Sequence, residues 1–247
     1  KDLEIALDIM AGPIEREARG WQLNLPESRK SSLKDFNVAI WSNDELAPVS
    51  KDISQRCEDV GKNLASIGAN VSYTAKPEHD FLKAEINYQL LLQSVMQSGM
   101  SDDEFKKIEE IASNLDRNDL SADAILAKGT VLSHRNWIRQ NYAREQIKIS
   151  WSKFFQEWDI LICPQLATTA IEHDHRKMSE RTIMIDNQEQ RFFQQIFWPG
   201  LAVNAHLPST VFPTGLASDG MPIGLQAIGG VYEDKTTIKF AELYEEE

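Results

Sequence analysis

Apolar residues recur along the chain with two different spacings, and these spacings predict both helices and strands. Helical spacing predicts helices within residues 2–10, 50–67, 81–95, 120–158, 192–198 and 236–244. Short apolar or β-rich runs predict strands at residues 36–41, 71–73, 159–164, 209–213 and 223–228. Because helices and strands alternate along the whole chain, we expect one α/β domain in which helices flank a mixed β-sheet.

Several helix ends carry local signals. The helix that begins near Ser50 is expected to stop at Gly68, because glycine readily adopts the left-handed conformation of a helix C-terminus. Ser101 followed three residues later by Glu104 predicts a capping box at the start of another helix. Residues 120–158 contain no proline, so they form either one long helix or two successive helices.

The first two predicted strands enclose a helix, which has a topological consequence. A strand at 36–41, a helix and a strand at 71–73 make a β-α-β unit, so the two strands should pair in parallel through a right-handed crossover. Two other segments lack any clear period. Residues 14–32 are polar and predict a connecting segment, and residues 165–190 predict a long loop.

Composition narrows the class of protein. The 247 residues are 42% hydrophobic, which is enough for a sizeable core. A net charge of −12 disfavours nucleic-acid binding through a general basic surface, because phosphate contacts need clustered Lys and Arg. No apolar run reaches the length of a membrane span. Two cysteines, Cys57 and Cys163, are too few for a disulfide framework, so we expect a cytoplasmic protein.

The start of the chain suggests a larger parent protein. Lys1 is followed directly by an amphipathic helical pattern, with no initiator Met before it. We therefore expect that the chain was cut from something longer.

Three segments resemble the amidase-signature family. Residues 2–13 read DLEIALDIMAGP, like the family's helix just downstream of the catalytic loop, and residues 158–164 read WDILICP, like a strand ending near the substrate pocket. The most specific segment is 207–229, where LPSTVFPTG is followed by DGMPIGLQAIG. The family repeatedly has Leu-Pro, then a strand with Pro and Gly, then Gly-Leu-Pro-x-Gly-Leu-Gln. Order and spacing agree across the whole chain.

The resemblance implies an amidase-signature-like fold of which residues 1–247 form the C-terminal portion of a single domain. It also implies hydrolysis of carboxylic amides to acid and ammonia or amine by a serine nucleophile, a bridging serine and a lysine base. A buried lysine with a lowered pKa can act as a base, and preorganised backbone N–H groups stabilise the oxyanion.

The family's catalytic residues have no counterpart in this sequence. The glycine pair Gly229-Gly230 leads into Val231, and the serine pair Ser31-Ser32 has no glycine beside it. We therefore assign no catalytic residue here, expect the catalytic half upstream of Lys1, and expect the isolated chain to be inactive. No cofactor is implied.

Four residues are expected at the substrate pocket by analogy with the family. Gln165 follows the strand that ends near the pocket, and Glu233 follows the last strand, at the pocket rim. Phe193 and Trp198 belong to an aromatic group at 192–198 that forms either a wall of the acyl pocket or part of the core. For Glu233 the alternative is a helix start, where an acid is favourable.

Other short patterns predict no separate chemistry. His173 and His175 supply two imidazoles with no third ligand, so a solvated loop is favoured over a metal site. Cys163 closes an apolar strand, which favours a small buried side chain over a nucleophile. The glycines at 215–220 are followed by Met221-Pro222 in place of the lysine of a phosphate loop, which favours turns.

Two alternatives to a general amidase remain. One is a non-catalytic scaffold or interaction subunit derived from half of an amidase. The other is the A subunit of glutamyl-tRNA amidotransferase, the one reading that involves tRNA. His206, where the family usually has Gly, and Val203, where it has Asn, favour a general amidase. The expected partners are a small-molecule amide, the missing N-terminal half and, because half a domain exposes an apolar seam, a second copy of the chain.

Overall fold

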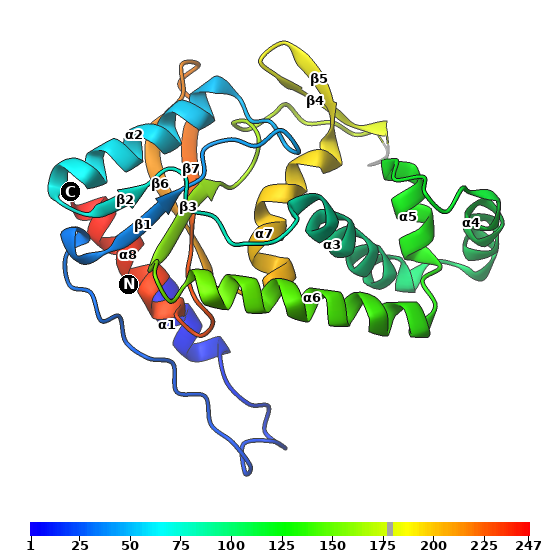
Figure 1. Cartoon of the computed structure of the whole chain (residues 1–247), viewed down its shortest axis with the longest axis horizontal. Coiled ribbons are helices and arrows are strands. Elements are labelled where there is room, and N and C mark those ends of the chain that lie inside the picture. Colours follow the sequence, from blue (N-terminus) through cyan, green and yellow to red (C-terminus); the bar gives the residue numbers. More distant parts are fainter. Residues whose placement is uncertain (177–179) are drawn as a thin grey trace. The chain divides into compact units, whose positions relative to one another are not determined.

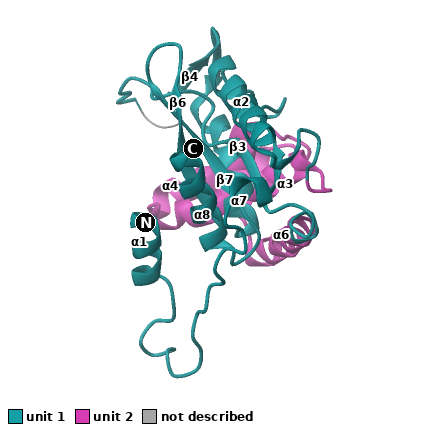
Figure 2. Cartoon of the chain, turned by 90° about the vertical axis from the view of Figure 1, so that its left-hand side faces the viewer, with its two compact units in different colours: residues 1–76, 152–247 teal, residues 77–151 magenta. Residues whose placement is uncertain are grey.

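The structure, a computed structural model, describes residues 1–176 and 180–247. The chain forms two compact units, shown in separate colours in Figure 2. Residues 1–76 together with 152–247 make an α/β unit, and residues 77–151 make a helical unit.

A five-stranded mixed sheet forms the centre of the α/β unit (Figure 1). Its strands, in spatial order, are β2 (Asn70–Ser72), β1 (Asn37–Ile40), β3 (Ile160–Pro164), β7 (Pro222–Ile228) and β6 (Ser209–Leu216). β1 pairs in parallel with both β2 and β3, whereas β7 is antiparallel to β3 and to β6. The predicted mixed sheet and the parallel pairing of the first two strands are confirmed.

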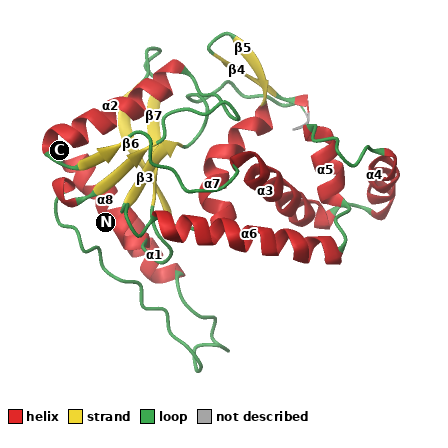
Figure 3. Cartoon of the chain, viewed as in Figure 1, coloured by secondary structure: helices red, strands yellow, loops and turns green. Residues whose placement is uncertain are grey.

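Helices surround this sheet, as Figure 3 shows. They are α1 (Asp2–Met10), α2 (Lys51–Ile67), α7 (Phe197–Ala205) and α8 (Asp234–Glu246). α2 contacts β1, β2 and β3, and α8 contacts β6 and β7 and also α1. Short 3-10 helices lie at Leu33–Asp35 and Phe192–Ile196. Residues 11–32 contain neither helix nor strand, as the polar pattern predicted.

The signals at the ends of α2 act as expected. The Ser50 hydroxyl accepts a hydrogen bond from the Ile53 N–H at the start of the helix, and Gly68 ends it with a φ of 104°. Between these ends the helix approaches β1 closely at Gly61. A Cβ there would lie 2.9 Å from Ile40 Cγ1 and 2.6 Å from the Tyr73 hydroxyl. Glycine at this position therefore sets the distance between helix and sheet.

β3 is the most deeply buried strand, because it has a neighbour on each side and helices over its surface. All five of its residues are buried, which explains its continuous apolar sequence. Aromatic side chains fill the surrounding core. The largest of those that are almost completely buried in this unit are Trp41, Trp198, Phe36, Phe212 and Phe240.

The helical unit consists of α3 (Phe81–Met96), α4 (Asp102–Asn114), α5 (Ala122–Thr130) and most of α6 (His134–Phe154), with a 3-10 turn at Gln97–Gly99. Residues 120–158 thus form two successive helices, one of the two predicted options. The capping box between Ser101 and Glu104 is confirmed. α3 and α5 pack tightly at Gly129, where a Cβ would lie 2.7 Å from Gln93 Cβ.

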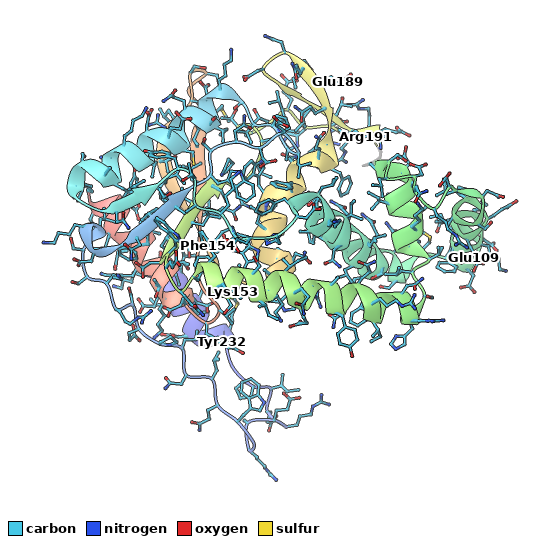
Figure 4. All side chains as sticks on the ribbon, viewed as in Figure 1. Glu109, Lys153, Phe154, Glu189, Arg191 and Tyr232 are labelled. Atoms are coloured by element: carbon cyan, nitrogen blue, oxygen red, sulfur yellow. The ribbon has the colours of Figure 1, made fainter. Side chains whose placement is uncertain are left out.

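One sequence-based expectation is wrong. Residues 165–190 were predicted to be a long loop, but β4 (Thr182–Ile185) and β5 (Gln188–Arg191) form an antiparallel hairpin there. Figure 4 places Glu189 and Arg191 on its second strand. Asp186 and Asn187 make the turn with positive φ angles of 46° and 67°, which such residues tolerate better than most others. Part of the predicted loop, residues 177–179, lies outside the described residues.

The start of the following helix is also displaced. Residues 192–196 form a 3-10 helix, and α7 runs from Phe197 to Ala205 rather than ending at Trp198. Across the described residues, no helix combines the length and apolar character that crossing a membrane requires.

Candidate functional site

The directions of the strands define two ends of the sheet. β1, β2 and β3 run in parallel, so their C-termini lie at one edge, which we call the carboxyl edge. β7 begins at this edge, since it is antiparallel to β3. Ligands of open α/β sheets bind outside the carboxyl ends of the parallel strands. We therefore take the carboxyl edge as the candidate site.

Gln165 lies at the carboxyl edge, directly after Pro164 at the end of β3. Its side chain is half-buried. The segment that follows is anchored to the start of α2, because the Ser50 N–H donates to the Ala167 carbonyl over 2.8 Å. Ala167 itself is buried. Gln165 therefore stands on a short connection that is fixed at both ends.

The predicted aromatic group divides into two parts. Trp198 is fully buried, and its indole N–H donates to the Ala47 carbonyl over 3.0 Å. Its ring centroid lies 5.6 Å from that of Trp41, and the ring centroid of Phe197 lies 5.9 Å from that of Trp41. These two residues belong to the core. Phe193, on the 3-10 helix that precedes α7, is half-buried.

Gln226 joins three segments of the α/β unit, namely the end of β3, α7 and the start of β6. Its side-chain amide donates to the carbonyls of Pro164 and Trp198, over 2.9 and 2.8 Å, and its oxygen accepts from Ser209 Oγ over 3.0 Å. Only 1% of the residue is exposed. The sequence pattern marks Gln226 only as one letter of a motif. Its position as a polar residue inside the apolar run 223–228 is the signal that could have identified it.

Two charged residues at the carboxyl edge, Lys76 and Asp44, were not predicted from the sequence. Lys76 Nζ lies 4.0 Å from the centre of the Trp41 ring and 3.4 Å from a carboxylate oxygen of Asp44. The Asp44 carboxylate also accepts from the Leu46 N–H over 3.0 Å, which fixes the turn after β1. Lys76 precedes Pro77, and nothing in the local pattern marks either charge as part of a site.

Glu233 lies at the opposite end of the sheet. It follows β7, whose last residue, Ile228, pairs with Leu161 near the start of β3. The Glu233 carboxylate accepts a hydrogen bond from Thr236 Oγ1 and lies 3.6 Å from the Arg29 guanidinium. Gln165 and Glu233 therefore do not line one pocket within this chain.

A small cavity of about 30 Å³ lies beside Glu233. Lys30 Nζ is 3.1 Å from an Asp159 oxygen on its wall, and the same carboxylate accepts from the Asn37 N–H over 2.8 Å. The cavity has the volume of about one water molecule. Its charges are paired, so the arrangement anchors residues 29–30 to the α/β unit.

The two cysteines and the histidine pair at residues 173 and 175 are the other candidates from the sequence. Cys57 and Cys163 are free and fully buried, and burial raises the pKa of both thiols. The rings of His173 and His175 stack with centroids 6.3 Å apart. Hydrogen bonds from Arg176 lower the pKa of Asp174, between them, to about 2. In the described part of the chain, no group of three or more His, Cys, Asp or Glu could hold a metal.

Hydrolytic chemistry also needs a paired nucleophile and base. Within residues 1–176 and 180–247, no serine hydroxyl is hydrogen-bonded to a lysine side chain. The closest arrangement is in the helical unit, where His79 Nδ1 lies 3.1 Å from Ser150 Oγ. Burial lowers the pKa of His79 to about 4, which makes it a weak base.

Comparison with known proteins places this chain in a family. The sequence profile described as Amidase matches residues 1–238. The A subunit of glutamyl-tRNA(Gln) amidotransferase from Saccharolobus solfataricus is 25% identical over 263 aligned residues, covering 99% of this chain and 52% of that protein. Its counterpart from Oceanobacillus iheyensis is 23% identical, covering 97% of this chain and 51% of that protein.

Solved structures with the same fold include amidase-signature enzymes. The A subunit of the Thermotoga maritima glutamyl-tRNA(Gln) amidotransferase superposes with a TM-score of 0.66 at 16% identity, covering 98% of this chain and 49% of that one. A bacterial aryl acylamidase of the amidase-signature family gives 0.64 at 15% identity, covering 98% of this chain and 50% of that one.

The mixed sheet, its flanking helices and the family match together define the class of protein as an α/β amidase-like fold. The chain belongs to the amidase family. It spans about half the length of the curated relatives it matches.

Proposed function

We propose that this chain is the C-terminal part of an enzyme that hydrolyses carboxylic amides, and that it supplies one wall of the substrate pocket. The family match over residues 1–238 is the observation that carries the proposal. In this proposal the serine nucleophile, the bridging serine and the lysine base lie in the remaining half of the enzyme. The free, buried cysteines suit a reducing cytoplasm.

The carboxyl edge supplies the wall in this proposal. Gln165 and Phe193 contact the substrate, because both are half-buried on short connections at or near this edge. Trp198 supports the wall from the core, and Gln226 holds it together by bonding to the carbonyls of Pro164 and Trp198. Glu233 lies at the other end of the sheet, so any contact that it makes with the substrate is at a separate rim.

The partner of this wall is the other half of the enzyme. α1 carries four large apolar side chains, Leu3, Ile5, Ile9 and Met10, that are between 51% and 81% exposed. Exposed apolar surface of this kind marks an interaction site. We propose that the catalytic half covers it.

A second candidate is part of an amidotransferase. Curated relatives that match almost the whole chain are A subunits of glutamyl-tRNA(Gln) amidotransferases. This reading adds tRNA and a second polypeptide as partners. It predicts that the protein purified from its own cells carries that polypeptide and releases ammonia from glutamine. A protein that purifies alone and hydrolyses other amides favours the general amidase.

The test compares the full-length protein with residues 1–247 alone. The full-length protein should have a mass near twice 28.1 kDa and should release acid and amine from a panel of simple amides. Residues 1–247 alone should give no turnover above a buffer blank. Turnover by the isolated chain would refute the division of roles.

A matched pair of variants tests the wall itself. In the full-length protein, Gln165→Ala should raise KM more than it lowers kcat, because the residue binds substrate without taking part in bond cleavage. Gln188→Ala, on the exposed hairpin, is the control. Equal effects of the two variants on KM and kcat would show that Gln165 does not contact the substrate. A full-length protein that is inactive on every amide would instead support a non-catalytic scaffold.

A further inference from the structure

The helical unit contains a groove that includes none of the residues of the proposed substrate wall. It has a volume of about 660 Å³ and lies among residues of α3, α4, α5 and α6 and their connections, all within residues 77–151. Figure 1 shows these four helices as one cluster. Small-molecule sites in proteins are hollows of about 300–1,000 Å³, so the groove has the size of a ligand site.

The floor of the groove is apolar. Leu90 comes from α3, Leu115 from the end of α4, and Val131 and Leu132 from the connection between α5 and α6. None of these four side chains is fully buried, so all of them can contact a ligand. An apolar tail would replace water over this floor, which is favourable.

The wall beside the floor is fixed by a lysine. Lys128 Nζ donates to the carbonyls of Asp116, Arg117 and Asp119, over 2.9, 3.2 and 2.6 Å. This ammonium holds the 116–119 turn in one conformation. The close approach of α3 and α5 at Gly129 fixes the part of α3 that carries Leu90. The groove is therefore preformed, which lowers the entropic cost of binding.

The rim of the groove is cationic. Arg117 and Arg139 line it and are exposed, and neither has a carboxylate within ion-pair distance among the described residues. Together with Lys128 they place three cations around the groove against one carboxylate, Glu109, on α4 (Figure 4).

We propose that this groove binds a monomeric anionic amphiphile, a carboxylate with an apolar tail. The tail lies over Leu90, Leu115, Val131 and Leu132. The carboxylate accepts hydrogen bonds from the guanidinium groups of Arg117 and Arg139, the side chains best suited to planar anions. A long-tailed carboxylate can contact the apolar floor and also bind the arginines of the rim, whereas an inorganic anion can bind only the arginines.

The experiment measures binding of a fluorescent probe, 11-(dansylamino)undecanoate, to the full-length protein in detergent-free buffer. Saturable binding is expected, together with about tenfold weaker binding of the methyl ester, because the ester lacks the charge that the arginines recognise. The double variant Arg117→Gln/Arg139→Gln should weaken binding of the acid by about tenfold or more and leave binding of the ester unchanged. Arg135→Gln, exposed on the same helix as Arg139 but outside the groove, should change neither.

A second pair of variants tests the location. Ala112→Trp fills the groove from α4 and should abolish probe binding, whereas Ile111→Trp, one residue earlier and outside the groove, should not. The circular dichroism of each variant confirms that the helices are formed. Equal binding of acid and ester, binding that survives Ala112→Trp, or no saturable binding would each overturn the proposal. Arginine-dependent co-sedimentation with phosphatidylglycerol vesicles would overturn it in favour of a membrane surface.

Discussion

At the scale of single residues, Gln226 links the end of β3 to α7 and to the start of β6. It is buried, and all three of its hydrogen bonds go to different segments of the α/β unit. A buried polar group is stable only while its partners are present, and its loss leaves each partner unsatisfied. Its fixed place in the Gly-Leu-Gln motif is therefore explained by packing at the end of β3.

Replacing Gln226 with leucine should be strongly destabilising. Gln226→Leu keeps the volume but leaves the buried carbonyls of Pro164 and Trp198 without a hydrogen-bond donor. We therefore expect a loss of about 3 kcal/mol in the free energy of unfolding. Urea unfolding followed by tryptophan fluorescence measures it. Gln188→Leu, on exposed β5, should change this free energy by about 0.5 kcal/mol or less. A similar loss in both variants would contradict this role for Gln226.

Gly61 is constrained by space and not by conformation. Alanine is usually favoured over glycine inside a helix by about 1 kcal/mol. Here the added Cβ would meet Ile40 and Tyr73 at less than 3.0 Å. Gly61→Ala should therefore destabilise the α/β unit by about 2 kcal/mol through overpacking.

The control for Gly61 is Gly99, where an added Cβ meets nothing within 4 Å. Gly99→Ala should be neutral or slightly stabilising in the same thermal or urea denaturation. A stabilising Gly61→Ala would show that helix and sheet can separate without cost at this point.

His79 makes the stability of the helical unit depend on pH. Burial lowers its pKa from 6.5 to about 4, against a smaller opposing effect of Asp80. The unfolded chain therefore binds a proton at a higher pH than the folded unit does. Stability should be unaffected by His79 above pH 6.5 and should fall as the pH drops from 6.5 toward 4.

Substitution isolates this contribution. His79→Gln should flatten the dependence of the unfolding midpoint on pH between 6.5 and 4. Carboxylates with lowered pKa values, such as Asp174, act at lower pH and should behave alike in both proteins. Parallel pH curves for the wild type and the variant would show that the folded unit protonates His79 freely.

At the scale of elements, the capping box shows how local sequence starts a helix. Ser101 Oγ accepts from the Glu104 N–H, and the Glu104 carboxylate accepts from the Ser101 N–H and hydroxyl. No residue of α4 is buried, so the helix gains little from packing and depends on its cap.

Removing the cap should therefore loosen α4 first. Ser101→Ala should cost about 1 kcal/mol and should speed amide hydrogen exchange in α4 more than in α3. Ser113→Ala, whose hydroxyl bonds only to a carbonyl within the same helix, serves as the comparison. Uniform exchange across both helices would mean that α4 is held by its neighbours instead.

The β4–β5 hairpin illustrates the limit of pattern reading at this scale. Ile183 and Ile185 are buried and alternate with the exposed Met184, which is strand periodicity. Only four residues carry that signal, and the turn lacks the glycine that usually marks a hairpin. A short alternation of apolar and exposed residues inside a polar segment therefore has the same sequence pattern as a loop.

For the whole molecule, exposed apolar surface decides how residues 1–247 behave alone. The four outward side chains of α1 would face water in the absence of a partner. We expect the isolated chain to dimerise or aggregate, with a light-scattering mass above 28.1 kDa. Ile9→Glu/Met10→Glu should shift it toward the monomer, whereas the exposed pair Glu15→Gln/Arg16→Gln should not. A monomeric wild-type chain at high concentration would contradict the expectation that the apolar face of α1 drives self-association.

The sequence by itself determined the type of most elements, the β4–β5 hairpin excepted, because helix caps and apolar spacing act over a few residues. It also predicted the mixed sheet and the family, through segments as specific as 207–229. What only the tertiary structure decided was which segments meet. Gln165 and Glu233 follow strands of opposite direction, so they lie at opposite ends of the sheet, and pairing direction is set by contacts between residues far apart in the chain. For the same reason, the partners of Gln226 and the cationic rim of the groove in the helical unit emerged only when distant residues were brought together.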